Sequence, residues 1–327
     1  MYAEPAGFDR RALMHVLTEW GIEAIELRYE PVGFGTHHYR VRAKDGQAWF
    51  VNVDELSTKT WWAHDDAFAA LEGALRATVL LRNAGLEFVH APSVGRNGSP
   101  LAPLAGGYAV SVYSVVHGES HRHGDYPTNE LRRRVLAAIG RLHASTKLLP
   151  AGLLQRDRLR VPLREPLIAA LANPSAAWSG GPYSTRAEQL VLPRANALRA
   201  LFTHYDELAQ SLRANSDDWV VTHGEPHAAN VMRTTDGAIR LIDWDTMAIG
   251  PRERDRWMLE PLGEDDSTAY TASNPGARID PEALAFYRLQ WTLSEICTYT
   301  ATFRGPHVDD ENTRLAWSEL EGYVHAM

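Results

Sequence analysis

Lysine and cysteine are both scarce in this chain of 327 residues. Lysine occurs only at Lys44, Lys59 and Lys147, so nearly all of the basic charge is arginine. The single cysteine, Cys297, excludes an intramolecular disulfide, and its apolar surroundings predict a buried structural thiol. No apolar run approaches membrane-spanning length, and the first residues lack the apolar core of a secretory signal. These absences predict a cytoplasmic protein without a membrane partner.

Basic residues are also fewer than acidic ones. The 41 acidic residues outnumber the 33 basic ones, and the net charge is −8. This balance argues against a nucleic-acid partner, which usually requires a basic surface. It suits a cationic or hydroxylated small molecule, although net charge alone does not identify one. The sequence leaves the choice between a monomer and a homodimer open.

The first third of the chain has the pattern of a strand-rich lobe. Helical spacing of Phe68, Leu71, Leu75 and Val79 predicts a helix that ends near Gly85. A further helix is predicted over residues 9–20, and strands over residues 26–30, 38–43, 48–53 and 108–116. The loop 31–36 carries Gly33 and Gly35. We place an N-terminal lobe at residues 1–116.

The remainder, residues 117–327, is mostly helical in pattern. Asn129 is suited to cap a helix through Leu142. Further helices are expected around residues 163–171, 187–212, 281–303 and 312–324. A strand-rich lobe followed by a helical one predicts a bilobal α+β fold of the protein-kinase-like type. In that fold a nucleotide would lie between the lobes, and we expect backbone groups near Ser114 and Val116 to hydrogen-bond its base.

The segment 223–245 contains the most specific pattern. Residues 231–233 and 239–242 read as strands, and Asp236-Gly237 is a hairpin-turn signal. Asn230 enters the first strand and Asp243 leaves the second, so antiparallel pairing places both at one end. Two adjacent oxygen donors suit Mg²⁺ that bridges nucleotide phosphates. Glu225 lies a few residues upstream, within reach as a base.

Four short motifs in combination resemble the aminoglycoside phosphotransferase family, and are similar above all to its spectinomycin phosphotransferase branch. They are His223-Gly-Glu-Pro-His-Ala-Ala-Asn230, Leu241-Ile-Asp-Trp244, Gly250-Pro-Arg-Glu-Arg-Asp255 and Gly140-Arg-Leu-His-Ala144. The resemblance implies that Asn230 and Asp243 hold Mg²⁺ and that Glu225 is the catalytic base. It also implies that His223 braces the loop and that Asp255 anchors backbone.

Two positions depart from the family pattern. Glu225 replaces an aspartate, and the extra methylene adds about 1.5 Å of reach, where a misplacement of about 1 Å can cost roughly 100-fold in rate. Asn52 stands where the third strand normally carries a lysine that pairs with a helix glutamate, here Glu72. Lys59 lies beyond that strand and Lys44 in the preceding hairpin, so a shift of the charge to a neighbouring lysine is not obvious. Partial replacements for the charge are Arg40, Arg42, His37 and His38. The resemblance therefore implies a nucleotide site formed by Gly33, Gly35, Asn52, Glu72, Ser114 and Val116, with phosphate binding weaker or differently arranged.

Three other patterns have simpler explanations. The spacing of His117, His121 and His123, and of His223 and His227, is compatible with zinc, but a solvated loop explains the first set as well. Trp61-Trp62 is better explained as core than as a substrate contact. The acidic run of Glu260, Glu264, Asp265 and Asp266 is either a solvated face or part of an acceptor site for an amine.

The main hypothesis is an O-phosphotransferase that uses ATP or GTP with Mg²⁺. Its acceptor would be a hydroxyl of a small amine-bearing molecule, such as an aminoglycoside or aminocyclitol antibiotic. One alternative is a kinase for an amino alcohol or sugar. Another is a nucleotide- or ligand-binding pseudokinase, which Asn52 and Glu225 motivate. A zinc hydrolase is the remaining alternative.

Overall fold

The computed structural model describes residues 3–5, 7–33, 35–61, 67–174, 177–214, 216–260 and 264–327, with the backbone alone for residues 264–267. The chain divides into two compact units. The first unit comprises Met1–Asp157 and Asp217–Ile279, and the second comprises Arg158–Ser216 and Asp280–Met327. The predicted lobe boundary at residues 116 and 117 falls inside the first unit.

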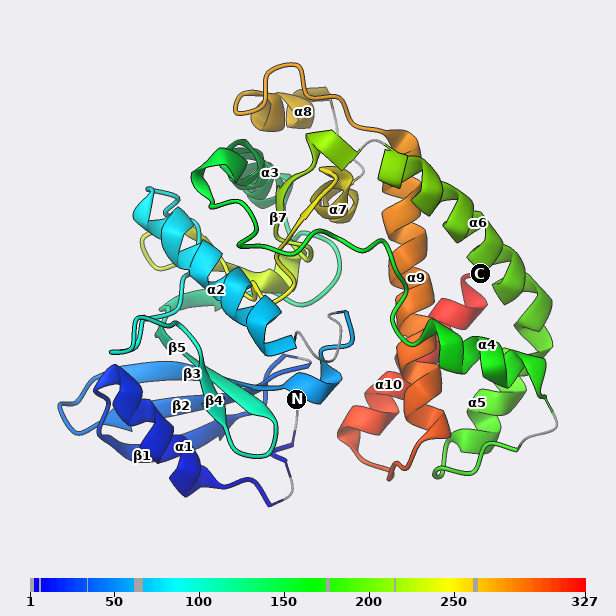
Figure 1. The fold of residues 1–327 in the computed structure, drawn as a ribbon, viewed down its shortest axis with the longest axis horizontal. Coiled ribbons are helices and arrows are strands. Elements are labelled where there is room, and N and C mark those ends of the chain that lie inside the picture. Colours follow the sequence, from blue (N-terminus) through cyan, green and yellow to red (C-terminus); the bar gives the residue numbers. More distant parts are fainter. Residues whose placement is uncertain are drawn as a thin grey trace. The chain divides into compact units, whose positions relative to one another are not determined.

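A five-stranded antiparallel sheet forms the N-terminal part of the first unit, with strand order β1-β2-β3-β5-β4 (Figure 1). Its strands are β1 (Ala24–Glu30), β2 (His37–Ala43), β3 (Ala48–Glu55), β4 (Ala102–Leu104) and β5 (Tyr108–Ser114). The four predicted strands are therefore confirmed to within a few residues at each end. The short strand β4 was not predicted.

Successive residues of β3 point to opposite faces of this sheet, as strand geometry requires. Val51 and Val53 join a buried core with Leu13 and Leu17, which lie on α1 (Arg10–Val16) and the 3₁₀ turn η1 (Leu17–Trp20). Asn52 and the residue two positions on, Asp54, therefore share the other face.

The helix α2 (Ala67–Asn83) confirms the predicted helical spacing. Leu71 and Leu75 pack against Leu101 and Ala109. Gly85 has a φ of 92°, the left-handed conformation that glycine adopts readily after a helix.

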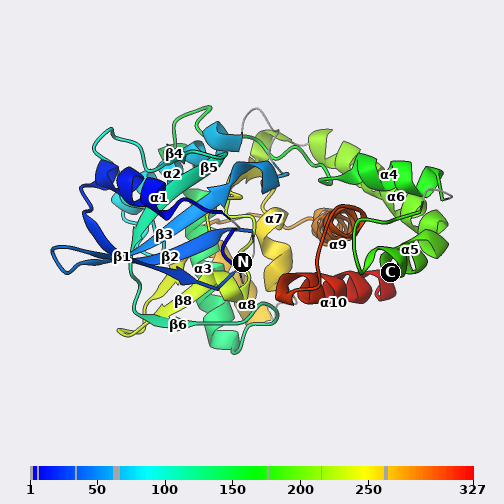
Figure 2. The same cartoon turned by 90° about the horizontal axis from the view of Figure 1, so that it is seen from below.

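Two small sheets follow in the same unit. They comprise β6 (Gly118–Ser120), β8 (Val231–Thr234) and β9 (Ile239–Leu241) in one, and β7 (Val220–Thr222) with β10 (Ala248–Gly250) in the other. β6 runs beside β8 (Figure 2). β8 and β9 form the predicted hairpin, with Val231 opposite Leu241. At the turn, Thr234 N donates to Ala238 O at 2.9 Å, and Gly237 has a φ of 81°. The Asp-Gly turn signal is confirmed.

The helices of the first unit's remaining part are α3 (Asn129–Ala144), α7 (Glu253–Arg256) and α8 (Glu264–Thr271). The prediction that Asn129 caps α3 is wrong, because the cap is Thr128, whose side chain accepts from Leu131 N. Threonine and asparagine both cap well, so the sequence could not separate neighbours. A Cβ on Gly140 would lie 2.9 Å from Tyr270 O, so the approach of α3 to α8 requires glycine.

The second unit is entirely helical in its regular structure, over the residues described. It contains α4 (Arg164–Ala172), α5 (Ser184–Val191), α6 (Ala195–Ala214), α9 (Pro281–Arg304) and α10 (Glu311–His325). The predicted helix 187–212 is instead two helices, separated by the 3₁₀ turn Leu192–Arg194, because Pro193 cannot continue an α-helix. α9 begins as predicted, with Pro281 in its first turn. Cys297 is 1% exposed, and burial raises the pKa of its thiol to about 12.

Among the described residues, no helix combines the length and the apolar character that crossing a lipid bilayer requires.

Candidate active site

The β8–β9 hairpin brings Asn230 and Asp243 to one end, as the sequence predicts. Ile242 N donates to Asn230 O at 3.0 Å, so the pairing continues one step beyond the strands. The Asn230 amide nitrogen donates to Glu225 O at 3.0 Å, which leaves the amide oxygen as the group suited to a cation. Asp243 has a φ of 64°. Left-handed backbone at a residue other than glycine costs on the order of 1–3 kcal/mol and is typical of functional sites.

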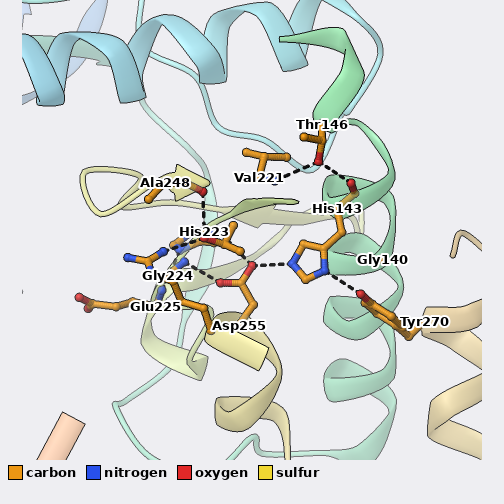
Figure 3. A network of polar contacts seen from close by, with 12 residues as sticks. Gly140, His143, Thr146, Val221, His223, Gly224, Glu225, Ala248, Asp255 and Tyr270 are labelled. Carbon is orange, nitrogen blue, oxygen red and sulfur yellow. Dashed lines mark hydrogen bonds and ion pairs between the residues drawn. The ribbon is translucent and has the colours of Figure 1, made fainter. Parts of the chain in front are cut away.

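Asp255 anchors the loop that carries Glu225. Its carboxylate is buried and accepts from His223 N at 2.9 Å and from Gly224 N at 2.6 Å (Figure 3). His143 Nε2 lies 2.9 Å from the same carboxylate. Burial raises the pKa of Asp255, but the hydrogen bond to His143 and the nearby charges outweigh burial and hold the pKa below its ordinary value. The prediction that Asp255 anchors backbone is confirmed.

Gly224 is required by the same loop. Its φ is 101°, and a Cβ would lie 2.6 Å from both Arg254 Nη1 and Thr246 Oγ1. Any side chain would therefore meet both a strained backbone and a clash.

His223 connects this loop to the segment after β9. Its Nε2 lies 2.9 Å from Ile242 O, and its Nδ1 accepts from Glu225 N at 3.3 Å. Its ring packs against Trp244, with the ring centres 4.3 Å apart. Burial lowers the pKa of His223 to about 4, so the ring is neutral at pH 7. A neutral ring with its proton on Nε2 satisfies both bonds. The imidazole therefore holds Glu225 and Asp243 in a defined relation.

The Glu225 side chain extends away from Asp255 (Figure 3), and about 31% of it is exposed. Its carboxylate lies 3.7 Å from His227 Nε2, and the His227 ring packs against His123 at 4.6 Å. Burial raises the pKa of Glu225, but the imidazoles of His227 and His223 and the guanidinium of Arg254 hold it below its ordinary value. The group is therefore an accessible carboxylate at neutral pH, as a base must be.

A buried cluster beside Asp243 was not predicted. Lys59 Nζ lies 2.6 Å from Asp54 Oδ1 and 2.7 Å from Asp245 Oδ2. Burial and the carboxylates of Asp245 and Glu225 raise the pKa of Asp243 well above its ordinary value. Negative charge thus exceeds positive charge here, and the oxygen donors of Asn230 and Asp243 fit a hard divalent cation.

Two predicted nucleotide-site residues have partners in or next to the five-stranded sheet and α2. Asn52 Oδ1 lies 2.9 Å from His38 Nδ1, on the face that Asn52 shares with Asp54. Glu72 accepts from Ser99 Oγ at 2.7 Å and from Arg76 Nη2 at 2.8 Å. The structure thus places Glu72 with Arg76 and Ser99, and Lys59 with Asp54 and Asp245.

The other predicted nucleotide-site residues lie in two places. Gly33 and Gly35 both have left-handed backbone, with φ of 70° and 83°. Ser114 and Val116 line a pocket of about 310 Å³. The other residues around this pocket are Arg82, Val89, His90, Ala91, Val115, His117, Thr234 and Arg240.

The remaining sequence patterns are placed as follows. The described residues contain no group of three or more His, Cys, Asp or Glu that could hold a metal ion. Lys59 Nζ lies 5.3 Å from the ring centre of Trp61, whereas Trp62 is outside the described residues. Glu260 pairs with Arg256 at 3.3 Å and lines a second pocket, of about 260 Å³. The side chains of Glu264, Asp265 and Asp266 are outside the described part of the structure.

Comparison with protein-family models identifies the family of this chain. The phosphotransferase enzyme family matches residues 28–287, which is more than half of the chain, so the protein belongs to this family. This confirms both the predicted phosphotransferase and the resemblance to the aminoglycoside phosphotransferases. Protein StrN of Streptomyces griseus is 30% identical over 263 residues, covering 77% of this chain and 76% of its own length.

Two solved structures share the fold at low sequence identity. Spectinomycin phosphotransferase, solved with ADP and spectinomycin, has a TM-score of 0.70 at 16% identity and is matched over 98% of this chain and 95% of its own. A microcompartment-associated aminopropanol kinase has a TM-score of 0.61 at 16% identity, over 97% and 95%. These likenesses confirm the predicted protein-kinase-like α+β fold.

Proposed function

We propose that this protein transfers the γ-phosphate of ATP or GTP to a hydroxyl of a small amine-bearing molecule, with Mg²⁺ as the metal. The observation that carries the proposal is the shared position of Asn230, Asp243 and Glu225 at one end of the hairpin. Residues 1–116 would bind the nucleotide, and residues 117–327 would provide the catalytic loop and the acceptor site.

Each residue has a defined task in this reaction. Asn230 and Asp243 would hold Mg²⁺, which neutralises charge on the phosphates when bound. The acceptor oxygen forms a bond to the γ-phosphorus as the bond to the β-phosphate oxygen breaks, and Glu225 takes the hydroxyl proton. The products are a phosphate ester and a nucleoside diphosphate. His223 and Asp255 keep Glu225 in position through the loop backbone.

The nucleotide base would lie near Ser114 and Val116, which line the 310 Å³ pocket. For the acceptor, the net charge of −8 favours a cation. The antibiotic bound to the similar spectinomycin phosphotransferase suggests aminocyclitols as first acceptors to test.

Release of nucleoside diphosphate tests the proposal directly. The purified protein is incubated with Mg²⁺, ATP or GTP, and a panel of aminocyclitols, aminoglycosides, amino alcohols and sugars. Diphosphate release with an amine-bearing antibiotic supports the proposal, whereas release only with a simple amino alcohol or sugar supports the metabolite kinase. Nucleotide binding without turnover on any acceptor supports the pseudokinase that Asn52 and Glu225 motivate. No Mg²⁺-dependent nucleotide binding would refute the phosphotransferase site.

A further inference from the structure

Lys59 carries a buried positive charge next to the candidate site. Its side chain is 1% exposed, and its ammonium contacts Asp54, Asp245 and the hydroxyl of Thr36, the last at 3.0 Å. These partners come from three segments: the end of β3, the segment that follows Asp243, and the residue that follows Gly35. The Lys59 ammonium therefore connects the turn that carries Gly33 and Gly35 (the glycine turn) to the loop that carries the predicted metal ligand Asp243.

The position of Lys59 is set by the turn that follows β3. The 3₁₀ turn η2 (Leu56–Thr58) ends with Lys59 N donating to Leu56 O at 3.3 Å, which directs the lysine back toward the strand. Asp54 lies on the same face as Asn52, about 7 Å along the strand. The Lys59 ammonium, which contacts Asp54, therefore lies about 7 Å along the strand from Asn52. The amide of Asn52 is neutral and is held by His38.

The three partners of the Lys59 ammonium differ in charge. Asp54 and Asp245 are carboxylates, whereas Thr36 offers a neutral hydroxyl, which itself donates to Asp54 Oδ1 at 2.7 Å. An ammonium has three donors, and a hydrogen bond to an anion is roughly twice as strong as one to a neutral acceptor. A phosphate oxygen can therefore replace Thr36 while both carboxylates stay in place. Lys59 contacts both the residue after Gly35 and the residue two positions after Asp243, so a triphosphate that reached both would lie near its ammonium.

We propose that Lys59 binds the phosphates of the nucleotide, held in place by Asp54 and Asp245, and supplies the positive charge absent from Asn52. The proposal rests on the phosphotransfer function above. It differs from a purely structural role, in which Lys59 only neutralises two buried carboxylates.

The test separates these two roles. Binding of a non-hydrolysable ATP analogue with Mg²⁺ is measured by calorimetry for five proteins: unsubstituted, Lys59→Met, Asp54→Asn/Asp245→Asn, the triple variant that combines these three substitutions, and the control Lys44→Met. Lys59→Met alone leaves two buried carboxylates unpaired and is expected to unfold readily. The triple variant removes both carboxylates with the lysine, so the charge imbalance is relieved.

We expect the triple variant to bind the analogue roughly 10- to 100-fold more weakly than the unsubstituted protein, the loss of one charge-assisted contact. Equal binding by these two proteins would overturn the proposal and leave Lys59 a structural residue. Lys44→Met is the matched control, because Lys44 is exposed and forms a surface ion pair with Glu23; its binding should equal that of the unsubstituted protein. Absence of binding by the unsubstituted protein itself would refute the nucleotide site as a whole, a result distinct from equal binding.

Discussion

The two sides of the candidate site are constructed differently. On the hairpin side, Asp255 and His223 hold the loop through bonds to backbone groups, and the proposed metal ligands Asn230 and Asp243 follow known motif spacings. On the side of the five-stranded sheet, Asn52 and Glu72 have local partners, while Lys59 pairs with Asp245 across 186 positions. The comparison indicates that motif spacing predicts the position of a site residue where backbone geometry fixes that residue. Motif spacing does not predict the position where a long side chain reaches the site from a neighbouring turn.

Removal of the charge at Asp243 should have the largest effect. Asp243→Asn is expected to lower turnover roughly 10²- to 10³-fold, because one charged group at the phosphates is lost. Asparagine tolerates the left-handed backbone at this position, so the fold should survive. Initial rates at saturating nucleotide and Mg²⁺ measure the effect. The matched control is Asp236→Asn in the turn of the same hairpin, and unchanged turnover of Asp243→Asn would refute the metal role.

Asp255→Asn tests the anchor on the hairpin side. We expect a loss of about 3 kcal/mol in the free energy of unfolding, because an amide cannot accept every bond that the buried carboxylate accepts. Chemical denaturation measures it. The control is the same substitution at Asp206, an exposed partner of Arg164, with an expected cost below about 1 kcal/mol. Equal costs at the two positions would contradict the anchoring role.

The effect of Asp255→Asn on the free energy of unfolding should also depend on pH. The pKa of Asp255 is depressed in the folded state, so its contribution to stability is fully present above the unfolded pKa of about 3.9. The difference in unfolding free energy between the unsubstituted protein and Asp255→Asn should therefore be constant above about pH 5. It should narrow as the pH falls through the folded pKa. A difference that widens in acid would contradict the depressed pKa.

Gly224→Ala should cost about 2 kcal/mol or more, since it combines a positive φ with a clash against Thr246 and Arg254. Gly46→Ala isolates the backbone contribution, because Gly46 has a φ of 88° and a Cβ there would meet nothing within 4 Å, and it should cost about 1 kcal/mol. Thermal unfolding of both variants provides the comparison. Equal losses would mean that the loop adjusts and that the contacts around Gly224 are not tight.

The smallest effect is expected on the side of the sheet. Glu72→Gln should change the KM for nucleotide less than about twofold, because Glu72 is partly exposed and bonded to Arg76 and Ser99. Steady-state kinetics over a range of nucleotide concentrations measure this. A large increase in KM without loss of stability would restore Glu72 to the nucleotide site and weaken the contrast between the two sides.

Much of the fold was predictable from local patterns. The strands of the five-stranded sheet, the Asp-Gly hairpin and the start of α9 at Pro281 follow from alternation, turn residues and helix-start signals. The cap of α3 was misjudged because Thr128 and Asn129 both cap well. The break at Pro193 was missed because helical spacing continues on both sides of it, although proline is itself a helix-breaking signal. The juxtaposition of Asn230 and Asp243 was predictable, because antiparallel pairing of a two-strand hairpin is a local property.

The sequence by itself determined the family, the hairpin and the residues at its end, since these depend on short spacings that backbone geometry converts directly into positions. Only the tertiary structure decided the distant partners of the buried charged side chains: Asp255 with His143, and Lys59 with Asp245. The physical reason is that a buried charge must find a counter-charge wherever the packed chain supplies one. For Lys59, the distant partner Asp245 lies 186 positions away.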